Sequence, residues 1–361
     1  MSNANGAADV EEFSGRLFDA VLGAMDMWAI YLGEQLGFYA ALVSDGSMTP
    51  DELSEAVSTD ARYTREWLEQ QTVTGILDVD DPSLDAGDRR YTLRASHAEV
   101  LTNRDSLDYL APFVRLVTAG GIQLPALVEA YRNGGGVSWE QFGPDMRTSQ
   151  AEMNRPWFLK ALGSDWFPSV PELHDRLLKG GRVADIGCGE GWSSIAIAQA
   201  YPGVTVDGFD VDTPSIEGAR RHAQDAGVSE RVRFHDADAG SLGFEREFDV
   251  VTAFECIHDL PHPVPVLTTM RNLAKEDGQV VVMDEKVSES FPGRGDDVER
   301  VMYGFSLFIC LPDGMSHPGS AATGTVMRPD TLRKYAQEAG FSDLETLPIE
   351  NDQWRFYRLI A

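Results

Sequence analysis

The chain has 361 residues, of which 43% are hydrophobic, and this length suffices for one large folded domain and a smaller one. Its 58 acidic and 30 basic residues give a net charge of -28, which disfavours nucleic acid and anionic membranes as partners. The first residues lack the basic and apolar regions of a signal peptide, and no apolar run is long enough for a membrane span. We therefore expect a cytoplasmic protein, with free thiols at its three widely spaced cysteines.

Residues 1–110 are predicted to form a mainly helical domain that ends in a short hairpin. Thr49, Pro50 and Glu52 are typical of a helix start, because threonine can cap the helix and glutamate can complete a capping box. Another helix is predicted within residues 58–77, and two short strands around a turn within residues 77–93. Helices followed by a β-wing are typical of winged-helix domains, many of which read DNA.

The charges of this domain argue against DNA binding. Between residues 31 and 110 there are 16 acidic residues against 6 arginines and no lysine. A basic recognition face would depend on Arg62 and Arg65, and Glu66 and Glu69 stand beside them in the sequence. We expect no nucleic-acid partner.

Residues 111–180 are predicted to form a helical connector, and residues 181–361 a larger α/β domain. In the latter, apolar runs alternate with amphipathic helices, which favours a parallel sheet covered on both faces. The predicted strands are GRVADIG, VTVDGFD, RVRFHDAD, FDVVTAF and GQVVVMD. Residues 285–327 are too many for a plain connection, so we expect a lid insertion there, with a helix in VMYGFSLFIC.

A glycine-rich turn follows the first of these strands, with Gly187, Gly189 and Gly191 at alternate positions. Such a turn lets a cofactor lie against bare backbone, but dinucleotide enzymes use similar turns, so the neighbouring residues must decide which cofactor binds. Asp185, just before the turn, would repel a pyrophosphate and favour a cationic ligand. S-adenosylmethionine (SAM) carries a sulfonium and an ammonium group and meets that requirement.

Two further acidic residues stand at the ends of the next strands. Asp210 lies about 20 residues beyond the glycines, where a carboxylate can accept hydrogen bonds from both hydroxyls of a ribose. Asp238, which Ala239 follows, can accept from an adenine amino group. Together these positions predict a site for an adenosine-containing cofactor.

The ordered set VADIGCGEG, VDGFDVD, HDADA, FDVVTAFECIHDL and GQVVVMDE resembles the class I SAM-dependent methyltransferases over about residues 181–283. The rest of the chain, including YLGEQLGFYAAL and AATGTVMRPDTLRKYAQEAGF, is similar to bacterial and archaeal methyltransferases with an N-terminal winged-helix segment. The resemblance implies a Rossmann-like, seven-stranded α/β sheet, SAM as cofactor and a small-molecule substrate. It also implies a homodimer through the N-terminal domain, which with residues 111–180 would roof the substrate pocket.

The same resemblance implies roles for individual residues. Asp185 and the glycines would hold the methionine part of SAM and Asp210 the ribose, while Asp238, Ala239 and Phe254 would complete the cofactor site. A hypothesis from another class is a winged-helix transcriptional regulator with a degenerate SAM-binding sensor domain. That hypothesis needs the basic face that the charges disfavour.

The fourth strand leads into AFECIHDLPHP, which places Glu255, His258 and Asp259 where the family holds the transferable methyl group. A histidine of near-neutral pKa suits a general base, and Asp259 or Glu255 could orient it. The Asn-Pro-Pro-Tyr type of motif found in amino-directed nucleic-acid and protein methyltransferases is missing here. These three residues are the catalytic candidates for a small-molecule substrate.

A second hypothesis for the same region involves a metal. His258 and Asp259 with His317 would supply two imidazoles and a carboxylate, a set that holds a divalent ion such as iron. This resembles iron-dependent α-keto acid C-methyltransferases, in which a 2-oxo acid binds the metal. The sequence leaves open an aromatic or a 2-oxo acid substrate, and oxygen, nitrogen or carbon as the acceptor.

Overall fold

The computed structural model describes the backbone of residues 2–361 and the side chains from residue 9 onward. The chain folds as two compact units, Met1–Thr118 and Ala119–Ala361.

The first unit has the predicted winged-helix order. Its elements are α1 (Ser2–Gln35), α2 (Phe38–Asp45), α3 (Pro50–Val57), α4 (Ala61–Val73), β1 (Leu77–Val79), β2 (Tyr91–Leu93), α5 (Ala95–Thr102) and the first part of α6 (Ala111–Ile122). Strands β1 and β2 pair antiparallel as the wing. The predicted capping box opens α3, since Glu52 N donates to Thr49 Oγ1 and Thr49 N donates to the Glu52 carboxylate.

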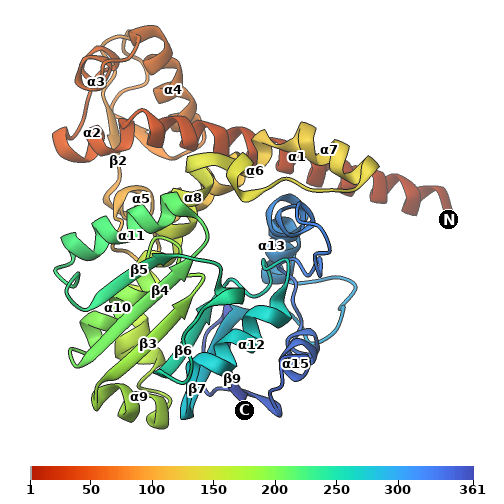
Figure 1. Cartoon of the computed structure of the whole chain (residues 1–361). Coiled ribbons are helices and arrows are strands. Elements are labelled where there is room, and N and C mark those ends of the chain that lie inside the picture. The colour runs from red at the N-terminus through yellow and green to blue at the C-terminus, as the bar shows by residue number, and fades with distance from the viewer. Residues whose placement is uncertain (1) are drawn as a thin grey trace. The chain divides into compact units, whose positions relative to one another are not determined.

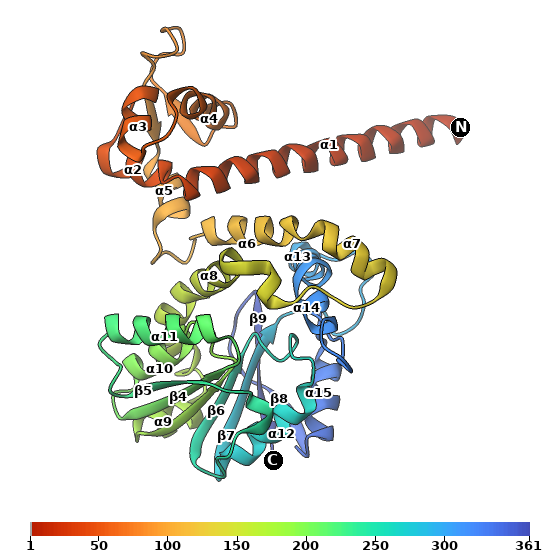
Figure 2. The same ribbon diagram turned by 45° about the horizontal axis from the view of Figure 1, so that its top comes forward.

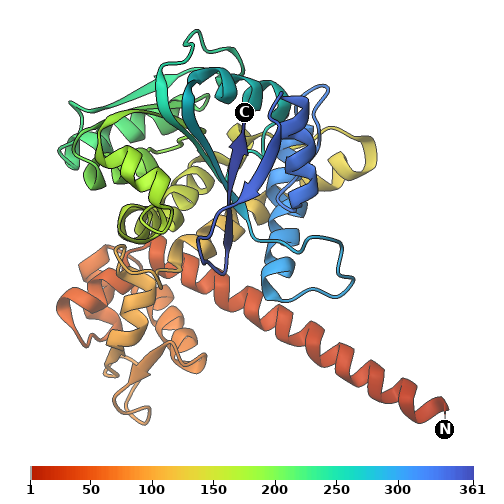
Figure 3. The same ribbon diagram turned by 90° about the horizontal axis from the view of Figure 1, so that it is seen from below.

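Helix α1 is the longest helix of this unit and extends far past the small helices around it (Figure 3). Its C-terminal part is tied to the unit where Trp67 Nε1 donates to Ala29 O at 2.8 Å. Buried Phe38, Leu53 and Leu68 form the centre of the unit's core. Residues 9–23 of α1 are all exposed to solvent.

Two arginines of the unit, one on α4 and one in the wing, pair with acidic residues of α4. Arg62 pairs with Glu66 at 2.5 Å, one helical turn along, and Arg89 from the wing pairs with Glu69 at 3.0 Å. The two ion pairs offset the positive charges of Arg62 and Arg89. They therefore weaken any basic surface that could contact the phosphates of DNA.

The second unit is a sheet with helices on both faces and a helical segment before it. Its helical elements are α7 (Leu124–Asn133), α8 (Trp139–Trp157), η1 (Phe158–Trp166), α9 (Pro171–Leu178), α10 (Trp192–Ala200), α11 (Thr213–Asp225), η2 (Ala239–Ser241), α12 (Pro263–Leu273), α13 (Asp297–Phe305), η3 (Ser306–Cys310), α14 (Leu311–Met315) and α15 (Pro329–Glu338). Its strands are β3 (Gly181–Ile186), β4 (Val204–Asp210), β5 (Val232–Asp236), β6 (Phe248–Phe254), β7 (Ala274–Glu285), β8 (Asp343–Thr346) and β9 (Trp354–Ile360).

The sheet has the order β5-β4-β3-β6-β7-β9-β8. The five predicted strands are β3 to β7, and they pair in parallel. Strand β9 lies antiparallel between β7 and β8. This arrangement confirms the predicted Rossmann-like, seven-stranded sheet.

Two hydrophobic layers cover the sheet (Figure 1). Helices α9, α10 and α11 pack on one face, with Leu173, Ile195 and Ile216 in the core, and α12 and α15 pack on the other. Because both faces of the central strands are buried, the strand sequences are largely apolar, with buried Asp185 and Thr252 as exceptions. The polar groups of the site therefore lie at the strand ends.

None of the helices in the described residues is by itself long and apolar enough to cross a membrane. Helices α6 and α7 meet the length and composition test only as a pair, and that pair is bent by 54°.

Candidate active site

The glycine turn joins β3 to α10 at the carboxyl end of the sheet. Gly187, Gly189 and Gly191 have φ of 66°, 50° and 82°, all in the left-handed region. Gly187 N donates to Phe209 O at 2.9 Å, and Gly189 N donates to Asp210 Oδ2 at 2.8 Å. The end of β4 thus fixes the shape of the turn.

Asp185 lies beneath this turn and is completely buried. Its carboxylate accepts hydrogen bonds from Ser193 and Ser194 at 2.6 Å each and from Thr252 at 2.8 Å. Burial raises the pKa of this carboxyl. The side chain ties together β3, α10 and β6, and its predicted part in holding the methionine portion of SAM stays a prediction.

The two other predicted acidic residues lie at the ends of β4 and β5. Asp210 also accepts from Asp212 N at 2.9 Å, and burial raises its pKa. Asp238 is exposed and caps η2 by accepting from Gly240 N at 2.8 Å, while Ala239 is buried behind it. Asp210 therefore borders the glycine turn. Asp238 and Ala239 lie just after β5, where η2 begins.

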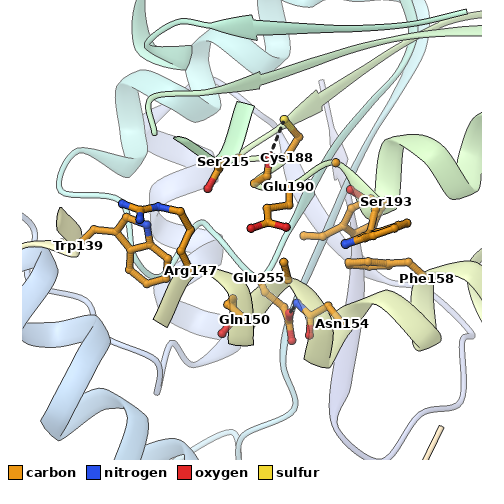
Figure 4. Close-up of a pocket in the computed structure, with 16 residues that line it drawn as sticks. Trp139, Arg147, Gln150, Asn154, Phe158, Cys188, Glu190, Ser193, Ser215 and Glu255 are labelled. Carbon is orange, nitrogen blue, oxygen red and sulfur yellow. Dashed lines mark hydrogen bonds between the residues drawn. The ribbon is translucent and has the colours of Figure 1, made fainter. Parts of the chain in front are cut away.

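A pocket that is partly open to solvent lies against the glycine turn (Figure 4). Helix α8 and the end of β6 form its other walls. Phe254 and Glu255, which were predicted to belong to the site, line the pocket. The lining residues of α8 were not predicted, because the sequence of a polar helix does not show which of its sides faces a pocket. The lining residues are Trp139, Arg147, Gln150, Ala151, Asn154, Phe158, Gly187, Cys188, Gly189, Glu190, Gly191, Trp192, Ser193, Ser215, Phe254 and Glu255.

Charged groups in the pocket wall are mostly committed to partners. Arg147 forms a two-pronged pair with Asp212, with contacts of 2.6 and 2.9 Å. Glu190, between two of the glycines, has its pKa raised to about 6 by burial.

Glu255 follows β6 with φ of 50°, which is unusual for a residue with a side chain. Its N–H donates to Met283 O at 2.8 Å, so the backbone continues alongside β7. The carboxylate accepts from the Trp354 indole and from the Asn154 amide. Burial raises the pKa of Glu255 to about 7.

His258 is buried and held between two carboxylates. Its Nδ1 lies 2.8 Å from Asp284 Oδ1 on β7, and its Nε2 lies 3.3 Å from Asp259 Oδ1. Burial by itself lowers the pKa of this imidazole, but the charges of Asp259 and Asp284 outweigh burial and raise it. Asp284 was not predicted; the acidic pair that ends the apolar run VVVMDE was the available signal.

The predicted metal set is not formed. Among the described residues, the group with ligand atoms within 4.8 Å of one another is His258, Asp259 and Cys310, without His317. Cys310 comes from η3, whereas His317 is an exposed residue beyond α14. One imidazole, one carboxylate and one thiol do not fit the two-histidine site for a chelated 2-oxo acid, so the metal hypothesis in that form is unsupported.

The helices of residues 297–315 are joined to the start of α8. Val137 N donates to Pro312 O at 3.0 Å, and Trp139 N donates to Asp313 Oδ1 at 2.7 Å. Figure 2 shows α8, α13 and α14 beyond the same end of the strands. Because Cys310 also reaches His258, this segment borders the site.

Comparisons with known proteins agree with this architecture. The family described as "Methyltransferase domain" matches residues 177–319, and the "Rv2258c-like winged HTH domain" matches residues 24–103. The ubiquinone biosynthesis O-methyltransferase of Paracidovorax citrulli is 36% identical over 188 residues, which cover 50% of this chain and 72% of that protein. The 27-O-demethylrifamycin SV methyltransferase of Amycolatopsis mediterranei is 35% identical over 126 residues, 35% of this chain and 46% of that protein.

Solved structures share the fold over nearly the whole chain. The mitomycin 7-O-methyltransferase MmcR has a TM-score of 0.75 at 20% identity, with 100% of both chains covered. Human N-acetylserotonin methyltransferase in complex with SAM has a TM-score of 0.72 at 17% identity, with 96% of this chain and 97% of that chain covered.

The strand order, the glycine turn and these matches define a Rossmann-like methyltransferase domain preceded by a winged-helix domain. The chain belongs to the class I SAM-dependent methyltransferases, the enzymes of EC 2.1.1, whose cofactor is SAM. It spans less than half the length of the first two curated relatives that it matches, 46% and 44%.

Proposed function

We propose that this protein transfers the methyl group of SAM to a hydroxyl oxygen of a small aromatic metabolite, with His258 as the general base. The observation that carries the proposal is the 2.8 Å contact between His258 Nδ1 and Asp284, which orients the imidazole so that Nε2, 3.3 Å from Asp259 Oδ1, would accept the proton. The ubiquinone biosynthesis O-methyltransferase and the mitomycin 7-O-methyltransferase MmcR are O-methyltransferases by name. A 2-oxo acid is disfavoured because it depended on the His317 metal site.

The residues around the pocket fit the cofactor. The glycine turn offers backbone without side chains, Asp210 has oxygen lone pairs left beside that turn, and Phe254 adds an apolar wall. When bound, SAM supplies an electrophilic methyl group on a sulfonium sulfur. Asp185 would keep the turn in shape from below, and Asp238 with Ala239 would border the adenine.

The chain's own part in the reaction is proton transfer and alignment. Neutral His258 accepts the hydroxyl proton at Nε2, and Asp284 and Asp259 then stabilise the imidazolium. A base fixed by buried carboxylates keeps its orientation as substrate enters, which supports alignment of the attacking oxygen.

Cofactor binding is tested at Asp210. Replacing Asp210 by asparagine should weaken S-adenosylhomocysteine (SAH) binding by about 10- to 100-fold, because a charged acceptor facing hydroxyls contributes roughly 1.5 to 3 kcal/mol. Isothermal titration calorimetry measures the affinity. Asp236→Asn is the matched control, since Asp236 is exposed at the end of the adjacent strand and pairs with Asp210 in register. If intact protein fails to bind SAH, the proposed function is wrong.

We further propose that the protein is a homodimer through α1. Taking 100° per residue, the apolar residues of α1 gather on one side of the helix, and each is 44% to 66% exposed. They are Val10, Phe13, Leu17, Phe18, Val21, Leu22, Met25, Trp28 and Leu32. A stripe of this length matches a second copy of itself, since two-fold interfaces join identical patches.

Placing a charge in the stripe should break the dimer. Leu17→Asp is expected to weaken association roughly tenfold or more, because the burial of each leucine contributes about 1.5 to 3 kcal/mol. Sedimentation over a concentration series measures this. Gly23→Asp is the control, because Gly23 lies on the opposite side of α1 in open space. Equal behaviour of the two variants would contradict the dimer through α1.

A further inference from the structure

Two carboxyl groups lie side by side at the carboxyl ends of β6 and β7. Glu255 continues beside β7 through its bond to Met283 O, and Glu285 is the last residue of β7. Trp354 is the register partner of Glu285, and its indole donates to Glu255. Trp354 therefore brings both glutamates to one side of the sheet, and Glu255 lines the pocket.

The hydrogen-bond partners of these carboxyls are not cations. Glu255 is held by an indole and an amide, which are neutral donors. Glu285 is 7% exposed, and its Oε2 is buried without a hydrogen-bond partner. A buried carboxylate without a positive partner is costly, so these groups favour a protonated form.

Other charged groups around the pair come from several elements. His258, from the loop after β6, is the nearby group that can be positive, and Asp284 and Asp259 lie on either side of it. The pocket wall adds Glu190 from the turn. On α8, Arg147 pairs with Asp212, and Arg155 lies 4.9 Å from the centre of the Trp192 ring. Around the two glutamates, acids therefore outnumber bases.

Burial and mutual repulsion act in the same direction. Burial raises the pKa of Glu255 to about 7 and that of Glu285 well above its ordinary value, and the charge of Glu255 raises the pKa of Glu285 further. Near neutral pH the pair consequently retains a proton while the pocket holds no cation. A positive ligand group beside it would reverse the preference.

We propose that Glu255 and Glu285 form a charge-sensing subsite, which releases a proton to solvent when a cationic sulfonium occupies the pocket and takes one up when the sulfur is neutral. This inference rests on the proposed function, since it requires the cofactor in this pocket. It gives the site a means to hold SAM more tightly than SAH, the product, whose sulfur carries no charge. In this step the O–H bond of one carboxyl group breaks and its proton passes to water, and no other bond changes.

The expected pH dependence follows from the ionised form. The cationic sulfonium binds best when the carboxyl group is ionised. The affinity of the pocket for SAM is therefore reduced below the carboxyl pKa and reaches its full value above that pKa. With a pKa of about 7, affinity should rise about tenfold from about pH 6 to about pH 8. SAH should lack this increase.

The test is calorimetry with SAM, with SAH and with sinefungin, which carries an amine in place of the methylsulfonium group. Titrations in two buffers of different ionisation enthalpy count the protons released. SAM and sinefungin should release up to one proton more than SAH near neutral pH, and Glu285→Gln and Glu255→Gln should each reduce that difference. Asp236→Asn is the control, because Asp236 is an exposed carboxylate outside the pocket lining and its loss should leave the difference in place.

The outcomes separate this inference from the proposed function. If SAM and SAH both bind with the same proton release and pH dependence, the charge-sensing subsite is wrong and the cofactor site stands. If neither ligand binds the intact protein, the proposed function fails and the subsite fails with it. The wild-type proton count needs no variant, and unchanged SAH affinity would show that the glutamine variants are folded.

Discussion

Replacing His258 by alanine is expected to lower turnover by about 10²- to 10⁴-fold, the usual contribution of a positioned general base. The hydroxyl oxygen attacks the methyl group more readily when a base accepts the hydroxyl proton. His258 Nε2 is the acceptor that we propose. SAH affinity should stay close to that of the wild type, because His258 does not line the cofactor pocket. Single-turnover methylation and calorimetry on the same samples measure the two effects.

Two other histidines serve as controls for this variant. His262 and His317 are both exposed to solvent. The backbone next to His262 is held separately, because Ala321 N donates to the carbonyl of Pro261. His262→Ala and His317→Ala should keep turnover within a few-fold of the wild type. A large loss in His317→Ala, or full activity in His258→Ala, would contradict the base mechanism.

Asp284 is a positioning residue, and its role appears in the pH profile. The base works when His258 is neutral, so turnover should rise with pH through the raised His258 pKa. Asp284→Asn removes one of the charges that raise that pKa, and the acid limb of the profile should move to lower pH. A residue that only supports packing would lower the whole profile without moving the limb.

The sequence predicts this fold well because its signals are local. Strands β3 to β7 mostly alternate with helices, and the glycine turn falls where a strand meets a helix. Asp210 could be found in the same way, since it ends a strand at a fixed spacing from Gly189. These features depend on neighbouring residues and on the parallel sheet that they imply.

The catalytic surroundings could be predicted only in part, because they depend on contacts between distant segments. His258 and Asp259 are adjacent in sequence and were found together, but Asp284 and Cys310 reach them through β7 and η3. Asp185 was expected to face the ligand, and its three hydroxyl partners are visible only once β3, α10 and β6 are packed. His317 was chosen by residue type alone, and a lid's fold decides which of its side chains points inward.

The regulator hypothesis needs a positively charged recognition helix and finds none in the described residues. The exposed pair Arg62–Glu66 on α4 leaves no net charge at the position where a DNA-reading helix would contact phosphates. The same winged-helix unit instead exposes an apolar stripe on α1, which suits a protein partner better than a nucleic acid. The exposed stripe therefore supports the proposed homodimer through α1.

Gly191→Ala is expected to destabilise the protein by about 2 to 5 kcal/mol, for two separate reasons. A residue with a side chain at φ of 82° carries a strain of roughly 1 to 2 kcal/mol. In addition, a Cβ there would lie 2.5 Å from Phe234 Cζ and 2.9 Å from Ala219 Cβ, and overpacking of a core costs about 1 to 3 kcal/mol. Denaturant unfolding of the full chain measures the loss.

Alanine variants of two other glycines with positive φ distinguish the effects of backbone strain, side-chain crowding and ligand contact. Gly227 has φ of 68° and open space around its Cβ position, so Gly227→Ala should show the strain alone, about 1 to 2 kcal/mol. Gly189 has φ of 50° and the same open space, but it lines the pocket, so Gly189→Ala should match Gly227→Ala in stability and lose SAH affinity besides. If Gly189→Ala binds SAH as the wild type does, the cofactor does not lie against this turn, because a methyl group there would have to meet it.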